Sequence, residues 1–367
     1  MRRGHLDQVD STILRGLAIL LIVFHNFLHV VPPSPGENEF GFDAALFPAL
    51  TESLRGEPAA APRLLTSYFG HYGVQLFIFL SAYGLTRKFR SQVPSYGPFI
   101  RSRFEKIYPA FVLAIALYVL RYGFSLGWNG PFSLLRAQWY PLLLKVTLVS
   151  NVVPGQALQP VGPWWFLPFI FQCYLVFPLL FAATARWGHG VSIAISLGGL
   201  AAAAFWPFPL EVMATVVGHL PEICFGLWLG TQNDWRVPRW MIWAAIPLFA
   251  LGNVYQAFWS IAPLSALVMM LAAWQTLGPR IGERLVARML AFVGTLSLPL
   301  FLVNGFLRPP FLGWAGAVDS EAIVLSIALL FALVSIGVAM VVHVIEQRLR
   351  RAVREWRDRR VQVAVAS

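Results

Sequence analysis

Charged residues are scarce in this sequence. Only 12% of its 367 residues are Asp, Glu, Lys or Arg, roughly half of the 25% that is usual in a soluble globular domain. Hydrophobic residues make up 57%, and an apolar chain with so little charge is typical of a protein that crosses a membrane several times. We therefore predict a polytopic membrane protein and not a soluble enzyme.

Cysteine is also rare. The chain has two cysteines, Cys173 and Cys224, and both lie inside long apolar segments. Cysteines that form a disulfide framework or bind a metal usually occur in larger numbers and at characteristic spacings. These two residues are therefore interpreted as small buried side chains.

Acidic residues are fewer than basic ones, 17 against 28, which gives a formal net charge of +11. A strongly basic chain can bind nucleic acid, but here the basic residues concentrate beside the ends of apolar segments. Lys and Arg are typical of the cytoplasmic flanks of membrane helices. We therefore expect membrane lipid, and no nucleic acid, as the partner of these charges.

Ten apolar stretches approach the length of about 20 residues that a helix needs to cross a bilayer. They predict an all-α, polytopic integral membrane protein with about ten transmembrane helices, at residues 12–31, 72–88, 105–122, 164–184, 190–206, 211–230, 239–257, 259–277, 288–308 and 321–345. No small-residue cleavage site follows the first stretch, and Arg15 interrupts its start. We therefore expect this stretch to remain as a helix and not to be removed as a signal peptide.

The distribution of charge predicts the orientation of these helices. Residues 87–106 and the chain after Glu346 are rich in Lys and Arg, which indicates a cytoplasmic location for both. Residues 32–70 carry more acidic than basic residues and many prolines and glycines, which is typical of an outside loop. With ten spans, both termini are then cytoplasmic.

The remaining long connection, residues 123–163, is also placed outside by this count. Its apolar piece near residues 140–149 is too short to cross the membrane, so we expect a re-entrant or interfacial helix there. The chain divides into a transmembrane domain, residues 1–346, and an arginine-rich cytoplasmic tail, residues 347–367. We expect the tail to lie on anionic lipid headgroups.

Polar residues interrupt the first apolar stretch. On a helix, Arg15, His25, Asn26 and His29 fall within an arc of roughly 100°. Ionisable groups are costly in hydrocarbon, so they usually face a protein interior or a wet cavity, where they have a function. This stripe is therefore the first candidate site. Asp10, just before the stretch, is the predicted N-cap of the helix.

Arg15 and His25 are separated by ten residues, which corresponds to roughly 15 Å along a helix. A guanidinium is suited to phosphates or to a carboxylate partner, and a histidine can abstract a hydroxyl proton near neutral pH. This arrangement favours a reaction in which a donor and an acceptor enter from opposite sides. The alternative is a purely structural role, with Arg15 reaching to the interface and His25 bonded to another helix.

His25 and His29 also have the i, i+4 spacing of helical metal ligands. No carboxylate or cysteine nearby in the sequence offers a third ligand. We therefore expect no metal site. His29 or Asn26 is instead expected to orient His25.

The segment Arg15-Gly16-Leu17-Ala18 through His25 resembles the first-helix signature of acyltransferase family 3, the integral membrane acyltransferases that modify surface glycans and other extracytoplasmic acceptors. Further segments resemble later parts of the same family, at residues 77–89, 101–111, 164–178, 220–226 and 294–304. Two positions differ from the family pattern: Asn304 stands where many members have histidine, and Gln172 stands where some have glutamate. An amide cannot titrate, so Asn304 is expected at most to orient other groups.

The resemblance implies an acyl-CoA donor, here acetyl-CoA, that comes from the cytoplasm, and an acceptor hydroxyl on a lipid-linked or surface saccharide. It also implies that no cofactor is bound and that the protein lies in the bacterial cytoplasmic (inner) membrane. The oligomeric state stays open, with a homo-oligomer as one alternative. His25 would be the general base, and Arg15 would bind the donor or organise the site. The alternative is an exporter of glycan or acyl groups, which would use the same polar stripe as its path.

The residues expected to bind substrates come from this stripe and from the resembling segments. They are Asn26, His29, Gln75, Trp165, Gln172, Asn304, Arg101 and Arg103. Arg101 and Arg103, together with Lys106, would receive the donor phosphates, although a basic cytoplasmic flank explains them equally well. An interfacial aromatic belt likewise accounts for Trp165. The intramembrane Glu222 is a weaker candidate than His25.

Overall fold

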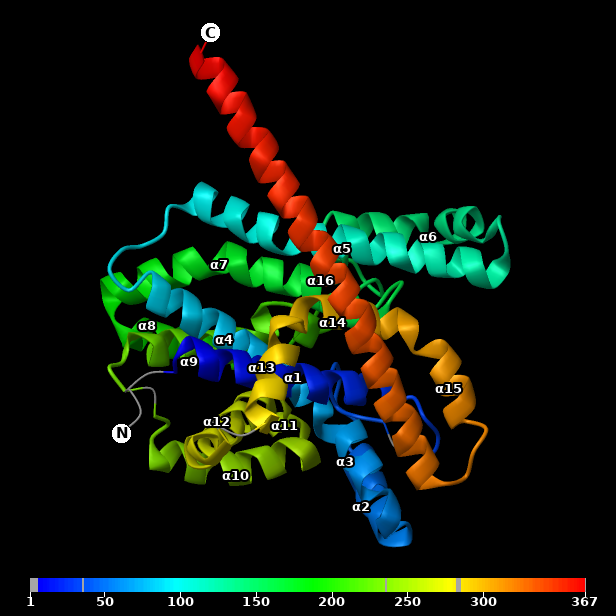
Figure 1. Ribbon diagram of the computed structural model, residues 1–367. Helices are drawn as coiled ribbons and strands as arrows, with labels where there is room; N and C mark the ends of the chain where they lie inside the picture. The colour runs from blue at the N-terminus through cyan, green and yellow to red at the C-terminus, as the bar shows by residue number, and fades with distance from the viewer. Residues whose placement is uncertain (1–5, 35, 235, 282–284, 367) are drawn as a thin grey trace.

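The computed structural model describes residues 6–34, 36–234, 236–281 and 285–366, and this part of the chain contains helices, turns and loops but no strand. The prediction of an all-α fold is therefore confirmed. Figure 1 shows the helices gathered around α1, while the C-terminal end of α16 projects away from them.

The first helix, α1 (Gln8–Leu28), lies at the centre of the fold. It packs against α4 (Gly73–Lys88), α13 (Leu285–Thr295) and α14 (Ser297–Leu307). Its apolar side chains are buried on several sides, as expected for a helix surrounded by others. The polar stripe of α1 therefore faces protein.

Two glycines allow α1 and α13 to cross at close range. A Cβ atom on Gly16 or on Gly294 would overlap the backbone of the opposite helix. Small residues at a crossing permit this approach in membrane proteins. Any larger residue at either position would push α1 away from α13.

The N-terminus of α1 begins after Asp7, whose carboxylate accepts a hydrogen bond of 2.8 Å from the backbone N–H of Asp10. A side chain in this position satisfies one of the free amides of the first helical turn. The prediction that Asp10 is the N-cap is therefore wrong by three residues, because the helix begins one turn earlier than the apolar pattern.

The other helices follow the predicted apolar stretches and their connections. They are α2 (Leu46–Gly56), α3 (Ala61–Phe69), α5 (Tyr96–Leu126), α6 (Gly130–Val146), α7 (Phe166–Trp187), α8 (His189–Ala204), α9 (Leu220–Thr231), α10 (Arg239–Val254), α11 (Gln256–Trp259), α12 (Ala262–Ile281), α15 (Pro309–Ala315) and α16 (Glu321–Ala366). Three short 3-10 turns lie near the candidate site: η2 (Gly70–Tyr72), η4 (Gly162–Trp165) and η6 (Val217–His219).

Among the described residues, three helical segments are long and apolar enough to cross a membrane. They are α1, the segment Gly162–Trp187 and the segment Glu321–Glu355. The pair α13 and α14, which is bent by 76°, would be a fourth. Each of the ten predicted stretches overlaps a helix, but the number of ten spans and the cytoplasmic location of the termini stay predictions.

Two connecting segments contain more helix than the sequence analysis predicted. The segment 32–70, which was predicted to lie outside, includes α2 and α3. The helix expected near residues 140–149 is α6, which begins ten residues earlier. The interfacial position of α6 stays a prediction. The predicted boundary at residue 346 falls within α16, which is continuous from the last apolar stretch into the arginine-rich tail.

Arg63 attaches α3 to the start of α16. Its side chain is 1% exposed, and its Nε and Nη2 atoms donate to the carboxylate of Glu321 at 2.8 and 2.6 Å. Its Nη1 atom donates to the backbone oxygen of Pro33 at 2.6 Å. A bidentate arginine–carboxylate pair restricts both partners geometrically, so this contact fixes the position of α3.

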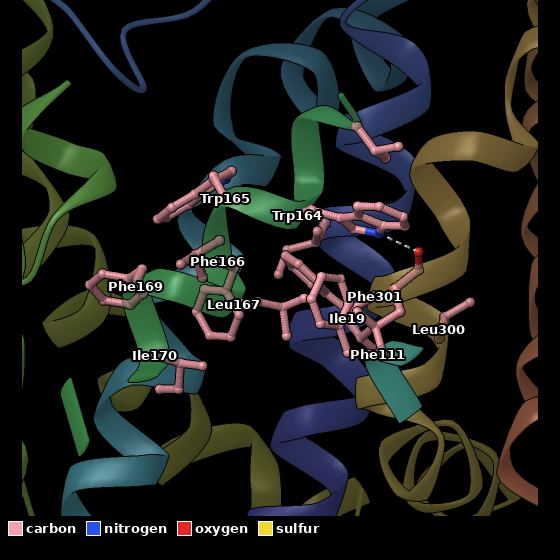
Figure 2. Close-up of a cluster of buried hydrophobic side chains, with 14 of the residues drawn as sticks. Ile19, Phe111, Trp164, Trp165, Phe166, Leu167, Phe169, Ile170, Leu300 and Phe301 are labelled. Atoms are coloured by element: carbon pink, nitrogen blue, oxygen red, sulfur yellow. Dashed lines mark hydrogen bonds between the residues drawn. The ribbon is translucent and has the colours of Figure 1, made fainter. Parts of the chain in front are cut away.

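Aromatic side chains fill the space between α7, α14 and α5 (Figure 2). Trp164 is fully buried, its Nε1–H donates to the backbone oxygen of Leu302 at 2.8 Å, and its ring meets Phe111 edge-on. A buried indole needs such a partner for its N–H. The bond holds η4 against α14 and thereby positions the neighbouring Trp165.

Candidate active site

His25 lies in the last turn of α1 and is 1% exposed. Its Nδ1 atom is 2.8 Å from the backbone oxygen of Ser67. Since a carbonyl can only accept, Nδ1 carries the proton and Nε2 keeps its lone pair. Among the described residues Nε2 has no hydrogen-bond partner, and Glu39 Oε2 is 3.8 Å away. His25 is therefore held in the tautomer that can accept a proton at Nε2.

A glycine lets the chain approach His25 closely. A Cβ atom on Gly70 would lie 2.7 Å from Cβ of His25. Without that Cβ, the end of α3 and the turn η2 pack directly on α1, which brings the Ser67 carbonyl to Nδ1. The local sequence thus determines which nitrogen of His25 is free.

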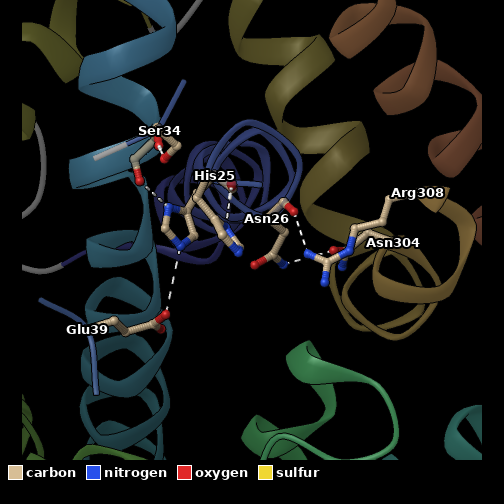
Figure 3. Close-up of polar contacts among 8 residues, drawn as sticks. His25, Asn26, Ser34, Glu39, Asn304 and Arg308 are labelled. Carbon is tan, nitrogen blue, oxygen red and sulfur yellow. Dashed lines mark hydrogen bonds and ion pairs between the residues drawn. The ribbon is translucent and has the colours of Figure 1, made fainter. Parts of the chain in front are cut away.

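Asn26 and Asn304 are hydrogen-bonded to each other. The amide nitrogen of Asn26 donates to the side-chain oxygen of Asn304 at 2.8 Å, and Asn304 donates in turn to carbonyls of its own helix. The Nη1 atom of Arg308 donates to the backbone oxygen of Asn26 at 2.6 Å (Figure 3). This geometry fits the orienting role predicted for Asn304.

His29 stacks at an angle on His25, with ring centroids 4.6 Å apart, and its Nδ1 atom lies 2.9 Å from the His25 backbone oxygen. The loop after α1 brings Glu37 to the two rings, so that one ligand atom from each of the three residues lies within 4.8 Å of the others. Burial raises the pKa of Glu37 to about 7, and the nearby His25 opposes this shift. No third ligand was apparent beside the histidines in the sequence, but the fold brings this carboxylate to them.

Two small adjoining cavities extend from His25. The first is lined by His25, Asn26, Glu39, His71 and Trp165, among others, and the second shares three of these residues. The second cavity continues to Asn38, Gln75 and His219. Each has room for roughly one water molecule. Together they form a polar chamber, defined here as the space between His25 and His219.

Arg15 lies in a separate and larger cavity of about 540 Å³, which reaches Lys106, Tyr174 and Arg350. An adjacent cavity of about 280 Å³ shares Arg15 and Lys106 and adds Lys88 and Arg103. We call the two together the basic cavity. Five cations line this space and attract phosphates or carboxylates.

Arg103 and Arg101 occupy different environments, although both were predicted to receive phosphates. Arg103 lines the basic cavity. The Arg101 side chain is 71% exposed, and its Nε donates to Glu105 at 2.9 Å, one helical turn away. Arg101 therefore lies on the outer surface of α5.

Phe301 separates the basic cavity from the polar chamber, because it lines both. Its ring centroid is 5.0 Å from that of Phe166, and the two ring planes are tilted by 47°. Phe301 is buried. Arg15 and His25 thus face two compartments on opposite sides of an aromatic barrier.

The remaining predicted site residues have different surroundings. Gln75 and Trp165 are buried and line the polar chamber. The side-chain oxygen of Gln172 accepts a hydrogen bond of 3.1 Å from the backbone N–H of Val216, so Gln172 supports a turn beside the chamber. Glu222 is fully buried, and its carboxylate lies 3.8 Å from Nδ1 of His219.

The sequence analysis did not identify several residues of the two compartments. Glu39, Asn38 and His71 line the chamber, and Lys88 lines the basic cavity. The first three belong to the segment 32–72, where acidic and polar residues are typical of a solvated loop. No local pattern distinguishes a loop that folds back onto a helix end from one that does not.

The structure has a central helix with a buried polar stripe, two internal compartments and several apolar helices of membrane length. These features define the class of helical integral membrane proteins with internal polar cavities. A family model described as an acyltransferase domain, acyltransferase family 3, matches residues 9–344. The chain therefore belongs to this family, as its first helix suggested, and the family indicates acyltransferase activity in general. No curated protein and no solved structure matches the chain.

Proposed function

We propose that this protein transfers an acyl group, and specifically acetyl, from cytoplasmic acyl-CoA to a hydroxyl of a surface or lipid-linked saccharide in the bacterial inner membrane. The observation that carries this proposal is the free Nε2 of His25. This atom is buried and unpartnered among the described residues, and it faces a polar chamber next to a basic cavity. Such a group is suited to general-base catalysis.

The basic cavity suits the donor. Arg15, Lys88, Arg103 and Lys106 surround a space that could receive the phosphates of a CoA nucleotide. The helical rise places His25 roughly 15 Å from Arg15 along α1. An extended thioester arm must cover this distance and pass Phe301 to bring its carbonyl to Nε2.

The polar chamber suits a saccharide acceptor. Trp165 offers an aromatic face, while Gln75, Asn38 and Glu39 offer amide and carboxylate groups that hydrogen-bond hydroxyls. The chamber in the described state has room for roughly one water, so binding of a sugar requires it to widen. The segment with Asn38 and Glu39 forms one wall and comes from the predicted outside loop.

The proposed chemistry uses His25 twice. Nε2 takes the proton of the acceptor hydroxyl while its oxygen attacks the thioester carbonyl, which forms the new C–O bond. The C–S bond then breaks, and the departing CoA thiolate receives the proton from the imidazolium. Glu39, at 3.8 Å from Nε2, stabilises the imidazolium between these steps.

An assay with radiolabelled acetyl-CoA tests this function. Purified protein in detergent is incubated with labelled acetyl-CoA and a panel of lipid-linked and free saccharides, and label is followed from CoA to the acceptor. We expect transfer in the wild type and little in His25→Ala. Movement of intact glycan across proteoliposomes without loss of label from CoA would instead indicate the exporter.

A further inference from the structure

The imidazoles of His25 and His29 and the carboxylate of Glu37 converge at the C-terminal end of α1. One ligand atom from each lies within 4.8 Å of the other two. His25 is buried, and the other two residues are partly buried. Three such groups, two of them on one helix face at i, i+4, make a donor set that metal ions bind in other proteins.

Both imidazoles are already oriented as metal ligands usually are. Nδ1 of His25 donates to the Ser67 carbonyl at 2.8 Å, and Nδ1 of His29 donates to the His25 carbonyl at 2.9 Å. A metal-bound histidine commonly gives its second ring N–H to a carbonyl or carboxylate, which fixes the tautomer. In both rings the Nε2 lone pair therefore remains for a ligand.

A second observation comes from His25 alone. Its Nε2 atom is buried and has no hydrogen-bond partner within the described ranges. A buried polar atom without a partner is costly, so it usually has a function or a bound species. Glu39 lies 3.8 Å from it, which adds negative charge beside the three ligands.

The donor set indicates which ion fits. Two imidazole nitrogens and one carboxylate are ligands that Zn²⁺ accepts in a tetrahedral site with one open position. Mg²⁺ and Ca²⁺ prefer oxygen ligands. Ligand atoms around one Zn²⁺ lie about 3.3 Å apart, so a bound ion must draw the three groups together. Rotation of the Glu37 side chain, which is carried by a loop, can shorten its distances to the two imidazoles.

We propose that His25, His29 and Glu37 form a Zn²⁺ site, and that the bound ion inhibits acyl transfer. The inhibition rests on the proposed function, because the metal and the acceptor proton need the same lone pair on Nε2 of His25. The site itself does not depend on that function. Its chemistry makes the outer end of α1 sensitive to extracytoplasmic zinc.

Binding of Zn²⁺ tests the site without any measurement of activity. Full-length protein without a histidine tag is titrated calorimetrically with Zn²⁺ in detergent, for the wild type, Glu37→Gln and His29→Gln. We expect one Zn²⁺ per chain, and an affinity at least about tenfold weaker in each variant. Glu52→Gln, which removes an exposed carboxylate on α2, is the matched control and should bind like the wild type.

Acyl transfer tests the inhibition. Zn²⁺ should inhibit the wild type, a chelator should restore the rate, and Glu37→Gln should need at least about tenfold more Zn²⁺ for the same inhibition. Mg²⁺ at the same concentration should have no effect. Unchanged Zn²⁺ affinity in both ligand variants would overturn the site, and loss of transfer in chelator-treated wild type would overturn inhibition. Zn²⁺ binding by a protein that transfers no acyl group would overturn only the proposed function.

Discussion

Glu39 Oε2 faces Nε2 of His25 at 3.8 Å, on the side of the ring opposite to the Ser67 carbonyl. His25 is thus held between a neutral acceptor at Nδ1 and an acidic side chain near Nε2 (Figure 3). A carboxylate at this distance favours the charged form of the ring. Nε2 of His25 can therefore take up a proton and hold it for a short time, because the Glu39 carboxylate stabilises the charged ring. No solvent-exposed base is needed for this step.

We predict that His25→Ala lowers the rate of acyl transfer by about 10²–10⁴-fold, the usual contribution of a positioned base. His29→Ala should lower it less, because His29 contacts the backbone of His25 and the proposed proton transfer does not use its ring. The measurement is the transfer rate per folded protein in both variants. Near-wild-type turnover in His25→Ala would exclude the general base, and equal losses with lower thermal stability would indicate a structural role for both.

Glu39→Gln should lower kcat by roughly 10- to 100-fold, since an interaction with a charged group contributes about 1.5–3 kcal/mol. The KM for acyl-CoA should change little, because Glu39 lies in the polar chamber and not in the basic cavity. Steady-state kinetics against acyl-CoA measure both constants. A rise in KM alone would show that Glu39 binds substrate rather than stabilising the imidazolium.

Arg15→Lys should reduce kcat/KM for acyl-CoA by at least about tenfold, because an ammonium cannot reproduce the planar donors of a guanidinium. Arg101→Lys is the matched control, since Arg101 is exposed and paired with Glu105 on the surface of α5. Kinetics of the two variants in parallel provide the comparison. Equal activity in both variants would indicate that Arg15 only sets the orientation of α1 in the membrane and does not bind the donor.

Lys145 should make the stability of the protein depend on pH. Its side chain is fully buried, its Nζ atom donates to the Ala157 carbonyl, and burial lowers its pKa from 10.5 to about 7. Between pH 7 and 10.5 the unfolded chain therefore holds more protons at this group than the folded chain. Stability should rise over this window by up to about 1.4 kcal/mol per pH unit, and stay constant below it.

Thermal unfolding of the wild type and of Lys145→Met between pH 6 and pH 10 checks this expectation. The difference in stability should move in favour of the wild type as the pH rises above 7. A difference that stays constant with pH would show that Lys145 keeps its charge in the folded protein.

Thiol labelling tests the predicted topology. A cysteine introduced in place of Glu52, on the exposed surface of α2, should react with an impermeant reagent added from outside. A cysteine in place of Arg351, in α16 after the last apolar stretch, should react only after the membrane is opened. The reverse labelling pattern would show that the chain has the opposite orientation in the membrane, with the basic cavity outside.

The sequence predicted the polar stripe of α1 because its signal is local. Ionisable residues within an apolar helix are conspicuous, and their angular positions follow from the helical period alone. The prediction that Asn304 can only orient another group also followed from chemistry, since an amide does not titrate. Asn304 indeed lies 2.8 Å from the Asn26 amide.

The sequence did not predict which distant residues meet that stripe. Glu37 and Glu39 belong to a segment whose acidity suggested an outside loop. Long-range contacts hold this segment near α1, among them those of Arg63 with Glu321 and with Pro33. Arg101 and Arg103 are two residues apart in the same basic stretch, yet a helix turns them by about 200° relative to each other. Charge patterns therefore identified the stretch but not the side that faces the cavity.

The aromatic barrier of Phe301 and Phe166 has a consequence for the cell's energy supply. With the predicted topology, the polar chamber lies toward the outside and the basic cavity toward the cytoplasm, and Phe301, packed on Phe166, lines both spaces. A continuous file of water through both spaces would conduct protons and dissipate the electrochemical gradient. In the proposed reaction, the rings must therefore move aside for a thioester arm that fills the gap it opens, and close again before water can follow.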